Sequence, residues 1–394
     1  MLLGDLAADL ILPDGARAID IAGIAADSRS VGPGFLFAAL SGTATDGARF
    51  AGEAIGRGAV AVLAGTEALL DGAGDVPVLR ADDPRRALAL LAARYYPRQP
   101  EHLTAVTGTS GKTSVADFAR QIFTAAGKSA ASIGTLGVIT GNRREHGRLT
   151  TPDAVSLHAE LDRLAGEGVT HAAVEASSHG LDQRRLDGLR IEAAGFTNLG
   201  RDHMDYHPTV AAYLAAKLRL FAAILPPDKT AVIDMDGARA EDAAAVAKAR
   251  GQRLIRVGRA GEEMRLIGLK PDGFRQRLRV AVFGSDHEIL LPLAGAFQAS
   301  NALVAAGLAI AAGIDADTAL HALSRLNGPS GRLELAGRKN NRAMIFIDYA
   351  HKPDALKSAL AALRPRWVPA HRHVMAAAYL NSTMFLTYLT LAWV

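Results

Sequence analysis

One glycine-rich run, Gly108-Thr109-Ser110-Gly111-Lys112-Thr113, constrains the fold of this chain more than any other feature. It follows a short apolar stretch that predicts a buried strand at 103–107, and it leads into residues 114–126, whose pattern predicts a helix that ends at Gly127. Backbone N–H groups at a helix N-terminus carry partial positive charge, and glycines let the chain wrap closely around an anion. The run therefore predicts a phosphate-binding loop.

Two side chains of this loop add chemistry to the backbone. Lys112 can reach the outer phosphates of a nucleotide, and the Thr113 hydroxyl can ligate Mg²⁺. The longer Walker loop has a further glycine where this sequence has Val106, so the match is to a shorter variant. An ordinary strand-to-helix turn is the alternative, but the register of the lysine and the threonine favours nucleotide binding.

The loop lies in a region where strand and helix patterns alternate. Short buried strands are predicted at 103–107, 171–175, 193–197 and 230–234. Such alternation is typical of an α/β fold with a parallel sheet covered by helices on both faces. Ligands of these sheets bind beyond the carboxyl ends of the strands. Polar side chains that follow a strand are therefore the first candidates for a site.

The length of 394 residues suits two or three domains. Before the loop, strands are predicted at 35–40 and 59–63 and helices at 51–57 and 84–95. Pro97 and Pro100 then punctuate the chain, and Asn327-Gly328-Pro329-Ser330-Gly331 marks a second break. We expect domains at 1–98, 99–330 and 331–394.

Composition excludes several classes of protein. Hydrophobic residues make up 49% and charged residues 21% of the chain, a balance typical of folded proteins with a core. The net charge is only +4 and the sequence contains no basic run interleaved with aromatic residues, so a nucleic-acid partner is not expected. The absence of cysteine excludes disulfides and thiolate ligands and fits the cytoplasm, and the N-terminus does not resemble a signal peptide. Residues 374–394 are uncharged but diluted by polar side chains, so we expect a buried hairpin or an abnormal chain end rather than a membrane span.

Polar clusters follow three further predicted strands or loops. Glu175 ends a strand and either holds Mg²⁺ or caps the next helix. The stretch from Asn198 to His207 holds two histidines, two aspartates and an arginine, a density that favours a site. The hydroxyls of Thr150 and Thr151 either cap a helix that starts near Asp153 or bind substrate.

Lys217 follows His203 by fourteen residues on a predicted helix. Its spacing alone indicates an ordinary solvated lysine on a helix surface. No feature of the local pattern assigns it to a site.

Taken together, these motifs resemble the Mur ligases of peptidoglycan synthesis, and most closely the group that adds the third amino acid. The resemblance covers residues from about 20 to 366. It rests on the loop, on Asp27-Ser28-Arg29, on Thr150-Thr151-Pro152, on Ser177-Ser178-His179-Gly180-Leu181 and on Phe196 through His207. It implies a three-domain α/β architecture with a small N-terminal α/β domain, a central phosphate-loop domain and an incomplete C-terminal Rossmann-like domain.

The resemblance also implies a reaction. ATP would phosphorylate the D-glutamyl carboxylate of UDP-MurNAc-L-Ala-D-Glu, and the amine of meso-diaminopimelate would attack the acyl phosphate and expel phosphate. Lys112, Glu175, His203 and Lys217 would be catalytic. Mg²⁺ would be held by Thr113, Glu175, His203 and Lys217, the last carbamylated by CO₂. The enzyme would be a cytoplasmic monomer without a nucleic-acid or membrane partner.

The implied binding residues fall into two sets. Those that bind ATP would be Gly108, Thr109, Ser110, Gly111, Lys112, Thr113, Ser114, Asn301, Arg332 and Asp348. Those that bind the nucleotide-sugar peptide would be Ser28, Thr43, Ala44, Thr45, Thr150, Thr151, Ser177, Gln183 and Arg185.

The sequence departs from the family after Pro365. The Asp-Asn-Pro-Arg motif that reads the incoming amino acid in the family is absent, and the run from about Trp367 does not follow the family pattern. The choice between diaminopimelate and lysine is therefore open. A relative of folylpolyglutamate synthase is disfavoured by Thr113 and by Asp27-Ser28-Arg29. A remnant that binds ATP and the UDP-sugar without completing the reaction is a further alternative.

Overall fold

The computed structural model describes residues 1–42, 45–141, 143–147, 149–338, 340, 344–350, 353–363, 376–379 and 386–389. Thr43 and Ala44, two of the residues expected at the nucleotide-sugar site, lie outside this range. In the part of the chain that is described, no helix has the length and apolar character needed to cross a bilayer.

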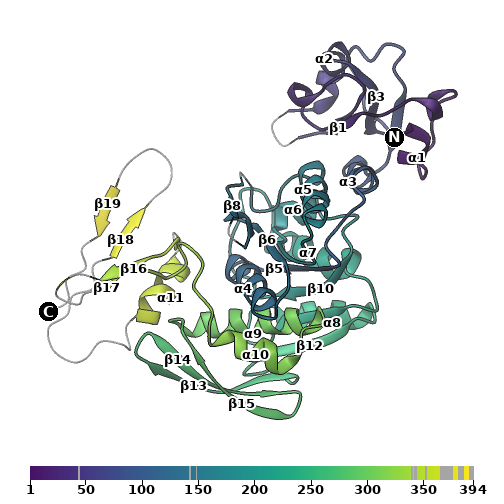
Figure 1. Ribbon diagram of the computed structural model, residues 1–394. Coiled ribbons are helices and arrows are strands. Elements are labelled where there is room, and N and C mark those ends of the chain that lie inside the picture. Colours follow the sequence, from purple (N-terminus) through teal and green to yellow (C-terminus); the bar gives the residue numbers. More distant parts are fainter. Residues whose placement is uncertain are drawn as a thin grey trace.

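The N-terminal unit is built on a four-stranded parallel sheet of order β1-β2-β3-β4 (Figure 1). The expected strands and helices of this part are confirmed. Its elements are α1 (Leu3–Leu6), β1 (Gly23–Ala25), β2 (Phe35–Ala39), α2 (Ala51–Gly56), β3 (Ala59–Gly65), β4 (Val78–Ala81) and α3 (Pro84–Tyr95), with 3-10 turns at Ala16–Ala18, Ser28–Ser30 and Gly47–Phe50.

The central unit holds a sheet of eleven strands in the order β15-β14-β13-β12-β11-β10-β5-β9-β6-β7-β8. Its strands are β5 (His102–Thr107), β6 (Ala130–Gly134), β7 (Gly137–Thr140), β8 (Arg143–Glu145), β9 (His171–Glu175), β10 (Ile191–Phe196), β11 (Thr230–Asp234), β12 (Arg253–Gly258), β13 (Met264–Asp272), β14 (Arg275–Val282) and β15 (Ser285–Leu291). The run from β12 through β5 to β6 is parallel, as the sequence predicts. Antiparallel strands extend both edges, which the alternation of strands and helices did not predict.

Helices cover the parallel strands on both faces (Figure 1). They are α4 (Lys112–Ala125), α5 (Ala154–Gly166), α6 (Ser178–Asp182), α7 (Val210–Arg219) with a π-helical turn at Leu220–Ile224, α8 (Ala240–Ala249), α9 (Ala296–Ala311) and α10 (Ala316–Leu323). Alternate residues of β5 divide between the faces: Val106 packs under α4 and α9, whereas Leu103 and Ala105 pack under α5 and α7.

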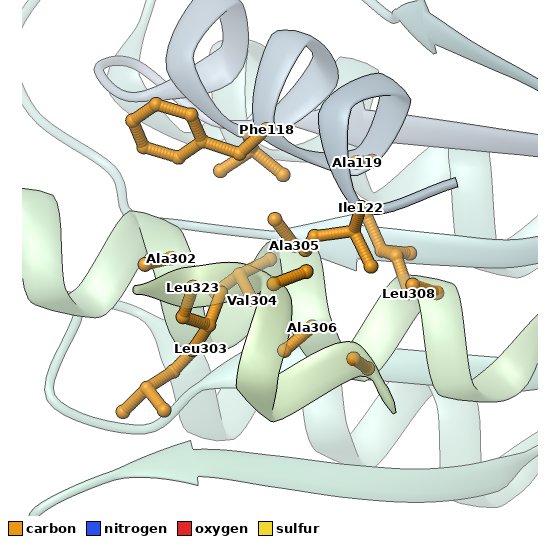
Figure 2. Packing of buried hydrophobic residues seen from close by; sticks show 14 of the residues in the cluster. Phe118, Ala119, Ile122, Ala302, Leu303, Val304, Ala305, Ala306, Leu308 and Leu323 are labelled. Atoms are coloured by element: carbon orange, nitrogen blue, oxygen red, sulfur yellow. The ribbon is translucent and has the colours of Figure 1, made fainter. Parts of the chain in front are cut away.

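Helix α4 carries the loop and is held by α9 (Figure 2). Phe118, Ala119 and Ile122 of α4 face Ala302, Ala305 and Leu308 of α9, and all are buried. The many alanines on α9 let the two helices approach closely. Full burial of a phenylalanine or isoleucine side chain contributes about 1.5–3 kcal/mol, so this packing fixes the position of the loop.

The C-terminal part contains β16 (Glu334–Arg338) paired antiparallel with β17 (Met344–Ile347), then α11 (Pro353–Leu363). Two further strands, β18 (Ala376–Tyr379) and β19 (Leu386–Leu389), pair antiparallel with each other. The pairing agrees with a hairpin within 374–394, and the expected burial of that hairpin is a prediction that stays open.

Candidate active site

The glycine-rich run joins the carboxyl end of β5 to α4, as predicted. Gly108 and Gly111 have φ angles of 147° and 92°, which other residues rarely adopt. A Cβ on Gly108 would lie 1.9 Å from the Thr197 hydroxyl oxygen, and one on Gly111 would lie 2.3 Å from Asn301 Oδ1. Both the backbone conformation and the close neighbours therefore require glycine at these positions.

The N-terminus of α4 has no side-chain cap at Gly111. Its first N–H groups therefore face the loop, where an anion is favoured. The Asn198 side chain holds the loop by accepting from the Ser110 N–H at 3.0 Å. Lys112 lies across the loop, and its ammonium donates to the carbonyls of Gly108 and Thr109 at 2.9 and 3.1 Å.

Glu175 lies at the end of β9, beside the loop, and its side chain is almost fully buried. One carboxylate oxygen accepts from the Thr135 N–H at 2.8 Å, and the other accepts from the Thr113 hydroxyl at 3.1 Å. Burial raises the pKa of the Glu175 carboxyl, while Lys112 and these hydrogen bonds oppose the rise. The helix-cap alternative for Glu175 is wrong, because the Ser177 side chain caps α6.

A second cluster lies beside Gly108 of the loop and centres on Tyr213 of α7. The Lys217 ammonium lies 4.4 Å from the Tyr213 ring centre and donates to the Gly108 carbonyl at 2.8 Å. His203, which has a φ of 53°, and His207 place their rings 6.2 and 5.2 Å from that ring. Lys217 is 1% exposed, so the expectation of a solvated surface lysine is wrong.

His207 carries an unsatisfied buried group within this second cluster. Its Nε2 atom has no hydrogen-bond partner among the described residues. Burial lowers the pKa of His207, Asp182 opposes this effect, and the positive charge of Lys217 adds to it. A hydrogen-bond acceptor between His207 and Lys217 would oppose the lowering of the His207 pKa by burial and by the charge of Lys217.

The four residues expected to hold Mg²⁺ make different contacts in the structure. Thr113 contacts Glu175, whereas His203 and Lys217 gather around Tyr213. Within the described ranges, no three His, Asp or Glu side chains gather in a way that could hold a metal ion. A hydroxyl beside a buried carboxylate is nevertheless an oxygen donor pair of the type that Mg²⁺ prefers.

The residues that we expect to bind the peptide end of the substrate lie close to Glu175. The Thr151 hydroxyl donates to the Glu175 carbonyl at 2.6 Å and accepts from the Ser177 N–H at 3.0 Å. Arg185 donates to the Thr151 carbonyl at 2.6 Å and to the Gln183 side chain at 2.7 Å. The helix-cap alternative for Thr150 and Thr151 is wrong, because Asp153 itself caps α5.

Three residues expected to bind ATP come from more distant elements. Asn301 of α9 is buried against Gly111 and donates to Gln298 at 3.0 Å. Arg332 reaches back from the C-terminal part and donates to the Thr113 hydroxyl at 3.4 Å. Asp348 instead accepts from the backbone N–H groups of Leu333 and Ala350, so here it orders the turn that carries Arg332.

The residues expected at the uridine end lie in the N-terminal unit. Ser28 is buried and donates to Glu53 at 3.1 Å. Thr45 is exposed in a turn where its carbonyl accepts from the Gly42 N–H at 2.8 Å. Arg184 and Asp83 form an ion pair at 2.7 Å that joins this unit to the central one.

Two residues of the site were missed from the sequence. Thr135 holds Glu175 and contacts the Thr150 hydroxyl at 3.0 Å, and its only signal is its place just after a strand. Tyr213 bonds the Thr109 hydroxyl at 3.0 Å and lies one turn before Lys217 on α7. Burial raises the pKa of Tyr213 to about 12, so its phenol stays protonated at neutral pH.

Comparison with known proteins agrees with this geometry. A family model described as the Mur ligase family catalytic domain matches residues 20–96, and the Mur ligase middle domain matches residues 106–309. The chain is 55% identical over 364 residues to the UDP-N-acetylmuramoyl-L-alanyl-D-glutamate–2,6-diaminopimelate ligase of Bradyrhizobium diazoefficiens, covering 91% of this chain and 74% of that one. Its identity to the ligase of the same name from a Chelativorans species is 54%, with 93% and 75% covered.

A solved structure of a ligase of the same name superimposes with a TM-score of 0.80 at 29% identity, covering 92% of this chain and 74% of that one. The fold and the loop therefore define an α/β protein of the phosphate-loop class. More narrowly, the chain belongs to the Mur ligase family.

Proposed function

We propose that this protein is an ATP-dependent peptide ligase that adds meso-diaminopimelate to UDP-MurNAc-L-Ala-D-Glu in peptidoglycan synthesis. The observation that carries the proposal is the contact between Thr113 of the phosphate loop and the buried Glu175 carboxylate, in a chain 55% identical to a ligase of that name. The proposal includes a monomeric enzyme that acts in the cytoplasm, with domains at 1–98, 99–330 and 331–394. Separate sheets within the first two ranges support that division.

ATP would bind with its phosphates on the loop from Gly108 to Ser114. The uncapped N-terminus of α4 supports this placement. On binding, Lys112 would exchange its two loop carbonyls for the γ-phosphate and offset the negative charge that develops during transfer. Arg332 reaches the same hydroxyl as Glu175 does, which supports its role at the phosphates, and Asn301 and Asp348 would complete the ATP site.

Thr113 and Glu175 would hold Mg²⁺ in this proposal. Their oxygens lie 3.1 Å apart, and the carboxylate is buried where a cation would relieve its desolvation. A bound Mg²⁺ supplies electrostatic stabilisation to a phosphoryl group in transfer. His203 would contribute from the second cluster.

Carbamylation of Lys217 would convert its amine into a carboxylate. Two observations support this modification: Lys217 is buried, and the Nε2 atom of His207 nearby has no hydrogen-bond partner among the described residues. A carbamate would replace the positive charge that lowers the pKa of His207 with an oxygen acceptor. It would also add a further oxygen ligand for a metal ion on this side of the loop.

The nucleotide-sugar peptide would extend from the N-terminal unit to the Glu175 cluster. Ser28 and the stretch Thr43-Ala44-Thr45 would bind its uridine end. Its peptide end would lie against Thr150, Thr151, Ser177, Gln183 and Arg185. The chain of hydrogen bonds from Arg185 through Thr151 to Glu175 supports this placement, because it links the expected peptide site to the phosphate loop.

Two alternatives follow from the run after Pro365, which departs from the family pattern. One is a ligase that accepts lysine instead of diaminopimelate. The other is a protein that binds ATP and the UDP-sugar peptide without completing the ligation.

Phosphate release with ATP and UDP-MurNAc-L-Ala-D-Glu separates these functions. The reaction is run with meso-diaminopimelate, with L-lysine and without an amine, and the peptide product is identified by mass. Release that depends on diaminopimelate is expected. Turnover that does not need an amine, or no turnover, would overturn the ligase function, and dependence on lysine would replace the amino acid.

A further inference from the structure

Gln121 makes an unusual contact on helix α4. Its side-chain amide pairs with the backbone of Asn327 in both directions, because Oε1 accepts from the Asn327 N–H at 2.9 Å and Nε2 donates to the Asn327 carbonyl at 2.9 Å. The side-chain amide thus makes one accepted and one donated hydrogen bond with a single residue, as a residue on a neighbouring β-strand does. Asn327 begins the segment 327–332, which leads from the central unit into the C-terminal part.

Other side chains of α4 hold this amide in one orientation. The second hydrogen of Nε2 goes to Asp117 Oδ2 at 2.8 Å. Asp117 is 6% exposed, and its other oxygen accepts from the Arg120 guanidinium at 2.7 Å. Because Asp117 can only accept, it fixes Nε2 as the donor and leaves Oε1 facing the Asn327 N–H.

The far end of the same segment also returns to α4. Arg332 donates to the Thr113 hydroxyl at 3.4 Å, and its carbonyl accepts from Gln298 at 3.4 Å. A turn closed by the Arg332 N–H on the Pro329 carbonyl at 3.0 Å lies between the two ends. Gln121 and Thr113 are eight residues apart on the helix, so the segment spans about 12 Å of its surface.

We propose that Gln121 is a positioning residue that fixes the start of this segment, so that Arg332 reaches the phosphate loop. The role rests on the proposed function only in giving Arg332 a part at the phosphates. Without the Gln121 contact, residues 327–331 lose their attachment to α4. Arg332 then samples more positions, and fewer of them contact Thr113.

The test uses the variant Gln121→Leu, which keeps the size of the side chain and removes all three hydrogen bonds. The matched control is Thr124→Ala on the same helix, because the exposed Thr124 hydroxyl donates only to the Arg120 carbonyl of its own helix. The chain has no cysteine, so cysteines introduced at Lys248 of α8 and Lys357 of α11 carry spin labels at two defined sites. Both positions are exposed.

Electron-spin distance measurements without nucleotide report the position of the C-terminal part independently of activity. We expect Gln121→Leu to broaden the distance distribution, and Thr124→Ala to leave it as in the unsubstituted chain. In the ligase reaction, Gln121→Leu is expected to lower kcat/KM for ATP roughly tenfold. Effects of this size are typical of substitutions that act on a site through packed side chains. The control should keep kcat/KM unchanged.

An unchanged distance distribution in Gln121→Leu would overturn the anchoring role. A broadened distribution with unchanged kcat/KM would overturn the link to the phosphate loop. If the unsubstituted chain shows no ligase turnover while Gln121→Leu still broadens the distribution, the proposed function fails and the anchoring role stands.

Discussion

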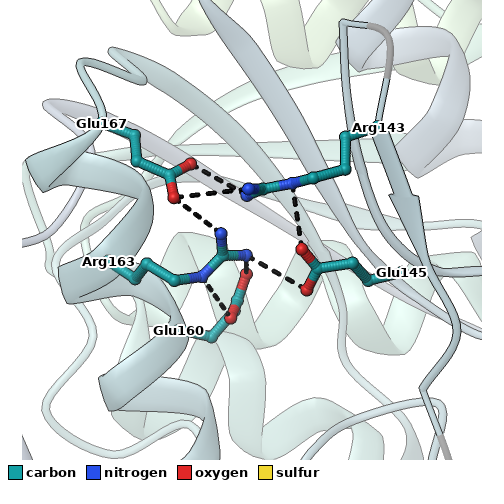
Figure 3. Close-up of polar contacts among 5 residues, drawn as sticks. All are labelled: Arg143, Glu145, Glu160, Arg163 and Glu167. Carbon is teal, nitrogen blue, oxygen red and sulfur yellow. Dashed lines mark hydrogen bonds and ion pairs between the residues drawn. The ribbon is translucent and has the colours of Figure 1, made fainter.

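Two polar clusters near α5 differ in burial and in the way their charges are paired. The Glu175 cluster, formed by Glu175 with Thr113, Thr135 and Thr151, holds one buried carboxylate among neutral donors, of which Thr113 and Thr151 are buried and Thr135 is exposed. The surface network of Arg143, Glu145, Glu160, Arg163 and Glu167 is partly exposed, and every charge in it faces an opposite one (Figure 3). Arg143 and Arg163 both bind Glu167, at 2.8 and 2.7 Å.

The difference indicates that the two clusters have different roles. A partly exposed network of paired charges gains little free energy, because water already solvates its charges. A buried carboxylate with only neutral hydrogen bonds is costly unless a cation joins it. The Glu175 cluster is therefore a place where the fold gives up stability and where a metal ion and a nucleotide would restore it. The predictions below test this contrast.

Lys112→Ala is expected to have the largest effect. It removes an ammonium that binds the loop carbonyls and whose charge acts on Glu175, so kcat should fall about 10²–10³-fold or more, as for loss of a donor to developing charge. Phosphate release measures the effect. Lys270→Ala, at an exposed position of β13, is the control and should keep full activity. Equal activity in Lys112→Ala would contradict the role of the loop.

Glu175→Gln should separate stability from activity. Activity should fall at least about 10–100-fold, the range seen when groups that support a metal site are lost. Burial raises the pKa of the Glu175 carboxyl, so the unsubstituted protein should lose stability as pH rises above 4.5, the ordinary value for glutamate, through the pKa of the folded state. The variant has no such charge to bury, so its free energy of unfolding should vary less with pH. Urea unfolding at pH 5 and pH 8 measures how the free energy of unfolding of each protein changes with pH. Equal changes in the two proteins would refute the cost that we assign to burying this carboxylate.

Gly111→Ala and Gly127→Ala form a matched pair at the two ends of α4. Both glycines have positive φ, but a Cβ meets Asn301 Oδ1 at the first and open space at the second. Gly127→Ala should cost about 1–2 kcal/mol for the left-handed backbone alone. Gly111→Ala should cost more and also weaken nucleotide binding. Thermal unfolding and calorimetric titration with ATP compare the two, and equal losses would show that Asn301 moves aside freely.

Arg163→Met should have the smallest effect, although it breaks contacts with three glutamates of the surface network. We expect a loss of about 0.2–1 kcal/mol and unchanged kcat, because exposed ion pairs contribute little. Raising the salt concentration should shrink the loss further. A loss of several kcal/mol would show that this network stabilises the fold in a way that its exposure does not indicate.

Much of this architecture follows from local sequence patterns. The loop, the strands around it and the first α/β unit were predicted, because glycine positions and apolar runs act over a few residues. The antiparallel strands β13–β15 were not, since the alternation of strands and helices says nothing about additions at the edge of a sheet. The helix-cap alternative for Thr150 and Thr151 was wrong because the Asp153 side chain caps α5.

Lys217 shows where prediction from the residues ended. Spacing placed it on a surface, but it follows Tyr213 by one turn and precedes the buried Phe221 by one turn, so it lies on the apolar face of α7. That periodicity was a signal for burial. What the periodicity could not give was the partner, because the Gly108 carbonyl comes from a segment about a hundred residues earlier.

The crowded glycines of the loop have a consequence for inhibition. A compact anionic inhibitor seated on the loop would be held by backbone N–H groups, which no point mutation other than one to proline takes away. A bulkier residue at Gly108 or Gly111 would collide with Thr197 or Asn301 before it reached the inhibitor. Resistance to such a compound would therefore have to arise elsewhere, in segments that the inhibitor need not touch.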